Sequence, residues 1–262
     1  MAASSATSTA RYPDLAGRVA IVTGGSKGIG AATCRQLAAN GAAVAVVARG
    51  KEAVDTLVHE LEATGARAVG VLADCADRAS VEQMVASVTE ALGPPDVCMA
   101  FAGGFHATTP ILEIGDEEWR RVLDDNLTAT FLTVQAVLRP MLERGRGSIV
   151  TMASNAARLL DIPLTASYAA AKAGVVMLTR HVAMEVGPRG VRVNAIAPAT
   201  TLTERVATTL SPEALAHVES SAPLRRIGLP EDSASAALFL ASDVSSWLTG
   251  ITIDVAGGRV MI

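Results

Sequence analysis

The sequence predicts an α/β fold in which a doubly wound, seven-stranded parallel sheet carries helices on both faces. Short apolar runs alternate with longer amphipathic stretches from Arg18 to the C-terminus, the order expected when helices connect parallel strands. Almost every position in these runs is apolar, which is typical of strands buried on both faces. The first run leads directly into a glycine-rich turn and a helix, a pattern that often opens such sheets.

Seven runs rich in valine, alanine and isoleucine are the predicted strands, and six amphipathic stretches are the predicted helices. The strands cover residues 19–23, 43–48, 68–72, 97–100, 148–152, 192–197 and 252–255. The helices cover residues 29–40, 52–64, 80–92, 116–144, 167–186 and 231–242. Acidic residues support the starts of two helices, since Asp116 and Asp232 would meet free backbone N–H groups in the first turn.

The chain is predicted to form one domain. Its 262 residues suit a single large α/β unit, and no internal repeat, low-complexity tract or linker divides them. Small and hydroxylated residues at the start predict a flexible tail over residues 1–14, followed by a single domain over residues 15–262. Residues 200–226 are the least regular stretch, and we expect them to act as a mobile lid over a bound substrate.

Composition excludes several classes of protein. Half of the residues are apolar and 18% are charged, which is far from the composition of a disordered chain. The net charge of −4 is spread without a basic cluster, so neither nucleic acid nor a membrane surface is an expected partner. No apolar run is long enough to cross a bilayer, and the start lacks the features of a signal peptide. We therefore expect a cytoplasmic protein.

The cysteines and histidines indicate no disulfide framework and no metal site. Cys34, Cys75 and Cys98 lie far apart and form no CxxC pair. The four histidines show no ligand spacing with one another or with acidic residues. No catalytic metal is expected.

A glycine-rich turn joins the first predicted strand to the first predicted helix. Glycines let the chain turn tightly and let its backbone approach a pyrophosphate, while free N–H groups at the helix start attract negative charge. This context predicts the dinucleotide site of a Rossmann fold. The residues expected to bind the cofactor here are Gly24, Ser26, Lys27, Gly28, Ile29 and Gly30.

Two cations are expected at the ribose end of this dinucleotide. Lys27 lies inside the glycine-rich turn, and Arg49 directly follows the second strand, where an acidic residue would hold the 2′-hydroxyl of NAD. Charge-assisted bonds to a 2′-phosphate favour NADP(H) over NAD(H). The alternative is that both side chains extend into solvent without binding the cofactor.

A tyrosine and a lysine form a candidate acid/base pair. Tyr168 and Lys172 are four residues apart in a predicted helix, so their side chains lie on one face. A free tyrosine has a pKa of about 10, and a nearby ammonium makes it a usable acid and base by stabilising the phenolate. Ser154, just after a predicted strand, would hydrogen-bond a carbonyl oxygen as charge develops on it. Asn126 lies inside a predicted helix, and we expect its amide to hold a water that links Lys172 to solvent.

These motifs, from the TGxxxGxG turn at Thr23 to the YxxxK pair at Tyr168, resemble the short-chain dehydrogenase/reductase family. The resemblance covers residues 15–258. Within the family, the chain resembles the 3-oxoacyl-[acyl-carrier-protein] reductases and related ketoreductases. It implies that Asn126, Ser154, Tyr168 and Lys172 are the four catalytic residues, with Tyr168 as the general acid and base. It also implies further cofactor contacts. These are Asp74, Cys75, Ala102, Gly103, Pro198, Thr201 and Thr203, together with Tyr168 and Lys172.

The sequence departs from the family pattern at two places. The NNAG motif appears as Ala100-Phe101-Ala102-Gly103, so the two asparagines whose amides normally brace the central strands are missing. The PG step appears as Pro198-Ala199. We expect the first departure to weaken local rigidity and cofactor affinity without affecting the proton chemistry.

The substrate pocket is expected between the segment after the fourth strand, the interval from Ser154 to Tyr168, and the lid. The middle of that interval is apolar, which favours a medium-sized, partly apolar ketone. The predicted pocket residues are Phe105, His106, Asn155, Leu160 and Leu164. For His106 the alternative is a solvent-facing loop residue.

The predicted function is an NADP(H)-dependent oxidoreductase that transfers hydride between nicotinamide C4 and a carbonyl or secondary alcohol. Its expected partner is a small-molecule substrate, and the family resemblance implies a homotetramer, with a homodimer as the alternative. Two other functions stay open. One is an NAD-linked alcohol dehydrogenase, and the other is a regulatory protein that senses NADP without turnover.

Overall fold

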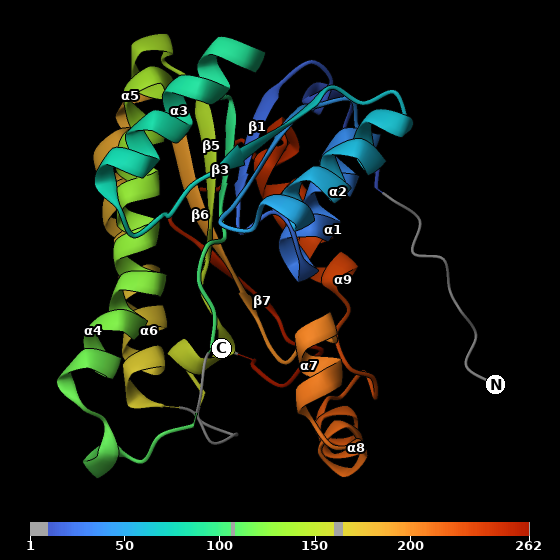
Figure 1. Cartoon of the computed structure of the whole chain (residues 1–262), viewed down its shortest axis with the longest axis vertical. Helices are drawn as coiled ribbons and strands as arrows, with labels where there is room; N and C mark the ends of the chain where they lie inside the picture. The colour runs from blue at the N-terminus through green and yellow to red at the C-terminus, as the bar shows by residue number, and fades with distance from the viewer. Residues whose placement is uncertain (1–9, 106–107, 160–164, 262) are drawn as a thin grey trace.

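The computed structural model describes residues 10–105, 108–159 and 165–261. At its centre lies one parallel sheet with the strand order β3-β2-β1-β4-β5-β6-β7 (Figure 1). The strands are β1 (Val19–Thr23), β2 (Ala43–Ala48), β3 (Ala68–Leu72), β4 (Val97–Ala100), β5 (Gly147–Met152), β6 (Val191–Pro198) and β7 (Thr252–Val255). The order reverses between β1 and β4, which confirms the doubly wound, seven-stranded sheet.

Helices cover both faces of the sheet. Figure 1 shows α1, α2 and α9 on one face and α3, α5 and α6 on the other. The α-helices are α1 (Gly28–Ala39), α2 (Lys51–Ala63), α3 (Arg78–Leu92), α4 (Asp116–Leu123), α5 (Ala129–Arg144), α6 (Ala166–Val186), α7 (Glu204–Thr209), α8 (Pro212–Ser221) and α9 (Pro230–Ala241). The 3₁₀ turns are η1 (Pro13–Leu15), η2 (Ile111–Glu113), η4 (Asn155–Ala157), η5 (Gly187–Arg189) and η6 (Asp243–Ser245). With both faces covered, a ligand meets the sheet at the ends of its strands.

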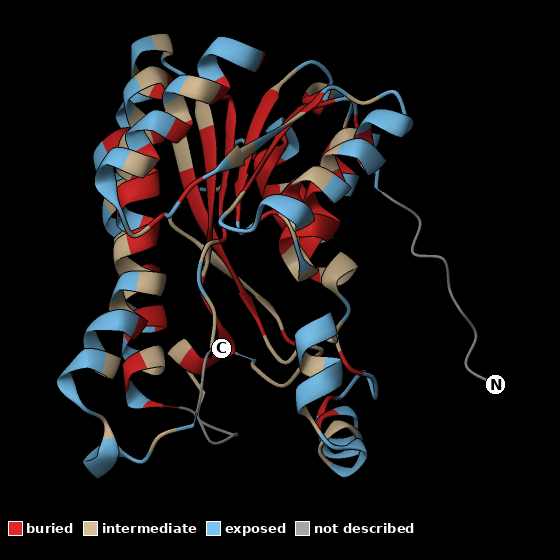
Figure 2. Ribbon diagram, in the orientation of Figure 1, coloured by how far each residue is buried: buried red, intermediate tan, exposed pale blue. Residues whose placement is uncertain are grey.

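The core lies on both sides of the sheet, because successive side chains of a strand point to opposite faces. Ile21, Cys98 and Ile149 belong to the core beneath α3, α5 and α6. Val22 and Met99 pack on the other side, with α1, α2 and α9. Figure 2 shows the central strands buried along their length between more exposed helices. This two-sided burial explains why the strands read as unbroken apolar runs.

The long helix predicted over residues 116–144 is interrupted. α4 ends at Leu123, a π-helical turn (η3, Asp124–Thr128) follows, and α5 begins at Ala129. A π turn carries an extra residue, and helical periodicity in the sequence does not mark it. Asn126 lies in this turn, so the interruption falls on a predicted catalytic residue.

Residues 200–226 are more regular than the sequence predicts, because they contain α7 and α8. The hydroxyls of Thr203 and Ser211 cap these two helices, which are too short to show a clear periodic pattern. Arg226 joins this segment to α9 through bonds to Asp232 of 2.6 and 2.7 Å. The expectation of an irregular stretch is therefore corrected, and movement of the segment as a lid stays a prediction.

The described end of the predicted tail is held against the body of the protein. The Tyr12 N–H donates to the Asn40 side chain at 2.7 Å, and the Asn40 amide donates to the Ala10 carbonyl at 3.1 Å. The Asp14 carboxylate accepts a bond from the Ser242 hydroxyl at 2.8 Å. The folded body thus begins before residue 15, and residues 1–9 lie outside the described residues.

Candidate active site

The glycine-rich turn lies at the carboxyl end of β1 and leads into α1. A Cβ atom at Gly30 would lie 2.1 Å from the Gly24 carbonyl oxygen, so only glycine fits this position. At Gly28, φ is +51° and an added Cβ would lie 2.9 Å from Thr203 Cγ2, which places the start of α7 against the turn. α1 begins at Gly28 without a side-chain cap, so its first N–H groups are available to a ligand. The turn therefore fits the pyrophosphate of a dinucleotide.

Thr23 braces the two strands on which this site is built. Its buried hydroxyl accepts N–H bonds from Phe101 at 3.0 Å and from Ala102 at 3.1 Å. Both donors stand in the segment that lacks the NNAG asparagines. The end of β4 is thus held against β1, while the effect of the missing amides on local rigidity and cofactor affinity stays a prediction.

We expect Thr23→Val to lower the free energy of unfolding by about 1–3 kcal/mol, because the Ala102 N–H loses its acceptor and the Phe101 N–H keeps only its 3.0 Å bond to the Met99 carbonyl, while the side-chain shape is kept. Thr23→Ser keeps the acceptor and is the matched control. Urea unfolding of the three proteins measures the difference. A serine variant as unstable as the valine variant would contradict the brace.

Asn126 holds the loop after β4 in place. Its buried amide accepts from the Gly104 N–H at 2.9 Å and donates to the carbonyls of Gly104 at 3.1 Å and Val122 at 3.0 Å. Gly103 fits beside this amide only without a side chain, since an added Cβ would lie 2.6 Å from Oδ1. Both amide hydrogens are used by protein carbonyls. The amide therefore positions this loop, and the water-holding role of Asn126 stays a prediction.

Lys172 is buried beside Tyr168 on α6. Its side chain is only 2% exposed, and Nζ donates to the Met152 carbonyl at 2.9 Å, at the carboxyl end of β5. Nζ also lies 5.6 Å from the centre of the Tyr168 ring. Burial lowers the pKa of Lys172 to about 8. The lysine is thus a charge held close to the phenol by the sheet.

The environment keeps Tyr168 protonated near neutral pH. Burial raises its pKa, while a hydrogen bond with Ser154 and the nearby Arg205 guanidinium act in the opposite direction. The net shift is upward in the protein alone. A protonated phenol next to a hydroxyl and an ammonium is arranged to give a proton to a substrate oxygen.

Ser154 connects this tyrosine to a buried amide. Its Oγ accepts from the Ala156 N–H at 3.2 Å, at the start of η4, and donates to Asn155 Oδ1 at 3.3 Å. The single hydroxyl proton of Ser154 can therefore point to Asn155 or toward Tyr168. Asn155 is 4% exposed, and its Nδ2 has no hydrogen-bond partner within the described residues. Asn155 is thus buried beside Ser154, and its place in the substrate pocket stays a prediction.

The other predicted pocket residues fall partly within the described structure. The Phe105 ring packs edge-on against Tyr168, with 5.6 Å between ring centres and 69° between ring planes. It therefore lies next to Tyr168, and its role in the substrate pocket stays a prediction. His106, Leu160 and Leu164 lie outside the described residues.

The predicted ribose and adenine contacts gather at the ends of β2 and β3. Arg49 is exposed directly after β2, and Lys27 is exposed in the glycine-rich turn. Asp74 is exposed after β3, where its carboxylate accepts from the Ala76 N–H at 3.0 Å. Burial raises the pKa of the neighbouring Cys75 thiol to about 11, so this thiol is neutral. Arg49 and Lys27 are thus both exposed cations that follow strands β2 and β1, respectively.

The residues after β6 divide between two roles. β6 ends at Pro198, and the Thr201 hydroxyl donates back to the Ala199 carbonyl at 3.1 Å. Thr203 caps α7 and places its methyl group at Gly28. Thr203 therefore lies at the phosphate end of the site, whereas the Thr201 hydroxyl is used by the backbone.

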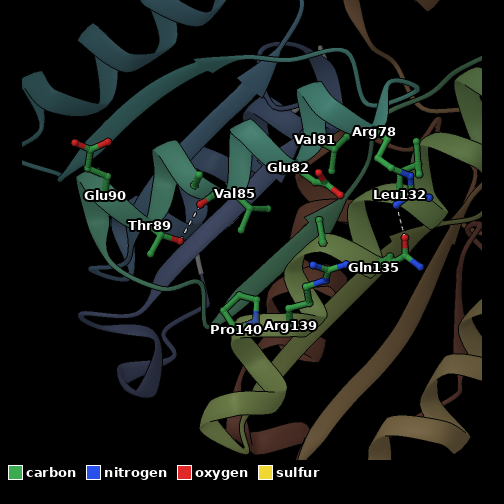
Figure 3. Close-up of a pocket in the computed structure, with 12 residues that line it drawn as sticks. Arg78, Val81, Glu82, Val85, Thr89, Glu90, Leu132, Gln135, Arg139 and Pro140 are labelled. Carbon is green, nitrogen blue, oxygen red and sulfur yellow. Dashed lines mark hydrogen bonds between the residues drawn. The ribbon is translucent and has the colours of Figure 1, made fainter.

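A separate groove lies between α3 and α5, away from these residues (Figure 3). It has a volume of about 610 Å³. Arg78 and Gln135 join across it through a 2.6 Å hydrogen bond. None of its lining residues is a predicted site residue.

Across the described ranges, no group of three or more His, Cys, Asp or Glu side chains is placed to hold a metal ion. None of the described helices is long and apolar enough to span a membrane.

Sequence reasoning missed three contributors to this site. Thr23 was seen only as part of a motif, although a buried hydroxyl at the end of a central strand is a usable signal. The Met152 carbonyl carries no sequence signal, since any residue supplies one. Arg205 was not singled out, and its only signal is a cation two residues after Thr203.

A glycine cradle for a dinucleotide beside a phenol, a hydroxyl and an ammonium defines a nicotinamide-dependent oxidoreductase that acts on alcohols or carbonyls. A family model described as "Enoyl-(Acyl carrier protein) reductase" matches residues 24–259. The chain belongs to the short-chain dehydrogenase/reductase family.

Three similar proteins illustrate this membership. The chain is 40% identical to a 3-oxoacyl-[acyl-carrier-protein] reductase of Synechocystis, over 94% of this chain and 98% of the relative. It is 37% identical to 3beta-hydroxysteroid dehydrogenase 1 of Eggerthella lenta, over 95% and 96% of the two chains. A crystal structure of a short-chain dehydrogenase/reductase from Mycobacterium marinum matches with a TM-score of 0.90 and 35% identity, over 96% of this chain and 98% of that one.

Proposed function

We propose that the protein is an NADP(H)-dependent carbonyl reductase or alcohol dehydrogenase of the cytoplasm. Hydride passes between nicotinamide C4 and the carbonyl carbon of a ketone or the carbinol carbon of a secondary alcohol. The observation that carries the proposal is the contact of Tyr168 with Ser154 and Lys172 at the carboxyl end of β5. The similar proteins reported above are named for a hydroxysteroid and for an oxoacyl group, and both names describe this chemistry.

The side chains of the site divide the proton work among them. Tyr168 gives its proton to the carbonyl oxygen in reduction and removes it from the alcohol in oxidation. The Ser154 hydroxyl donates to the same oxygen as charge develops on it. The Lys172 ammonium lowers the cost of the phenolate, and Asn126 keeps Gly104 and Phe105 in place beside the ring. When bound at the glycine-rich turn, the nicotinamide cofactor supplies or accepts the hydride.

Arg49→Asp is expected to raise the KM for NADPH by about 10–100-fold, because a charge-assisted bond to the 2′-phosphate is replaced by repulsion. The KM for NADH should stay the same or fall. Steady-state kinetics with a panel of ketones and both cofactors measures the two constants.

Arg189→Asp, the same change of charge at an exposed position in η5, is the matched control. Equal effects of Arg49→Asp on NADPH and NADH would contradict the NADP assignment. They would leave an NAD-linked alcohol dehydrogenase as the better description.

We also propose that two or four copies of the chain associate. Phe131 on α5 and Met177 and Met184 on α6 expose 40%, 59% and 73% of their surfaces, respectively. Apolar side chains of this size on neighbouring helices favour association over exposure to water.

A further inference from the structure

Arg205 on α7 reaches toward the catalytic tyrosine. A Cβ atom added to Gly104 would lie 3.5 Å from Arg205 Nη1, so the guanidinium lies against the loop that Asn126 positions. The next residue along that loop, Phe105, packs against Tyr168. Arg205 also acts electrostatically on the Tyr168 hydroxyl. A cation from the lid segment therefore stands beside the reacting group.

Arg205 is exposed, and no described side chain balances its charge. Its guanidinium makes no hydrogen bond or ion pair with the part of the chain that the structure describes. Arg158, by contrast, is paired with Asp254 at 2.5 Å, in a half-buried ion pair. Ser154, Phe105 and Lys172 lie against Tyr168, and none of them is an anion. The site thus presents a free positive charge next to an acid/base group.

The dinucleotide phosphates are a poor explanation for this charge. Thr203 approaches Gly28 in the glycine-rich turn, so the start of α7 faces the phosphate end of the site. Arg205, two residues later, lies against Gly104 instead. The start of α7 therefore contacts the glycine-rich turn, whereas Arg205 contacts the loop after β4, which lies nearer Tyr168.

We propose that Arg205 is a specificity residue that binds a carboxylate on the substrate, so that the enzyme acts on oxo acids and the corresponding hydroxy acids. This inference rests on the proposed carbonyl reduction. A guanidinium fork matches a carboxylate through two parallel hydrogen bonds. One guanidinium also balances the single charge of a carboxylate, whereas a phosphate monoester would bring nearly two charges.

The test compares oxo acids with their neutral esters. The substrates are acetoacetate, levulinate and 4-oxocyclohexanecarboxylate, each paired with its methyl ester, and the proteins are the wild type, Arg205→Gln and Arg205→Lys. For the best acid, Arg205→Gln should lower kcat/KM by about 10–100-fold, mainly through KM, because charge-assisted bonds are lost. Activity on the matching ester should change little. Arg205→Lys should recover part of the loss, and Arg189→Gln, at an exposed position in η5, should behave as the wild type.

Each alternative outcome has a distinct meaning. Equal losses for acid and ester, with a raised KM for NADPH, would show that Arg205 holds the cofactor and would overturn the inference. A wild type that prefers every ester, unchanged by Arg205→Gln, would overturn it while leaving carbonyl reduction intact. Absence of NADPH and NADH oxidation with every acid and ester would instead contradict the proposed function itself.

Discussion

We expect Tyr168→Phe to lower kcat by about 10²–10⁴-fold and to leave NADPH binding and the fold unchanged. The variant removes only the hydroxyl that we propose gives a proton to the substrate oxygen. The ring, its edge-on contact with Phe105 and its place beside Lys172 remain. Steady-state kinetics with the best ketone, together with NADPH fluorescence titration, separates the chemical step from cofactor binding.

The chain supplies its own control for this experiment. It contains two tyrosines, and the second, Tyr12, is half-buried near the N-terminus, where its backbone bonds to Asn40. Tyr12→Phe removes the same atom far from the strand ends and should leave kcat unchanged. Turnover by Tyr168→Phe at the rate of Tyr12→Phe would rule out proton transfer by Tyr168.

Lys172→Met is expected to lower kcat by about 10²-fold or more, because the phenolate loses the cation that stabilises it. The same variant should change how stability depends on pH in the protein without cofactor. Lys172 has a pKa of about 8 in the folded protein, below its ordinary value of 10.5. Between these values the unfolded chain binds more protons than the folded one, so this lysine makes stability rise with pH.

The expected difference between wild type and Lys172→Met therefore has a sign. From pH 7 to pH 10 the wild type should gain stability over the variant, by on the order of 2 kcal/mol. Urea unfolding at several pH values measures this change, and comparing the two proteins cancels the opposing contribution of the buried thiols. Lys51→Met, which removes an exposed lysine paired with Asp55, should show no such trend. Stability curves for wild type and Lys172→Met that run parallel from pH 7 to pH 10 would show that burial does not lower the pKa of Lys172.

Much of the fold was predictable because its strands are buried on both faces. Runs such as 43–48 have no polar position to confuse the pattern, and the glycine-rich turn marks where the first strand stops. The π-helical turn was not predictable, since Asp124–Thr128 looks like ordinary amphipathic helix until Asn126 is seen to bond to Gly104. The short helix α7 escaped for a similar reason, because six residues hold less than two helical turns.

The candidate site divides in the same way. Tyr168 and Lys172 were predictable, since a fixed spacing on one helix places them together wherever the helix lies. The contact between Arg205 and Gly104 depends on how two loops fold back over the sheet, and nothing local in either loop specifies it. Thr23 shows a third case. The missing asparagines predict weaker bracing of the strand end beside the cofactor. The Thr23 hydroxyl on the neighbouring strand accepts hydrogen bonds from two backbone N–H groups of that segment.

The π-helical turn also has a consequence for how this segment tolerates changes in length. An α-helix rotates by about 100° per residue, so one additional residue offsets the phase of α5 relative to α4 by that angle. α4 and α5 can therefore each turn a different line of side chains toward the protein interior. The amide of Asn126 lies in the turn between them. Deleting one residue between Asp124 and Thr128 would bring the two helices into one continuous phase. The Asn126 amide would then turn away from Gly104 and lose its hydrogen bonds to that residue. The length of this turn therefore fixes where the Asn126 amide meets the backbone of Gly104.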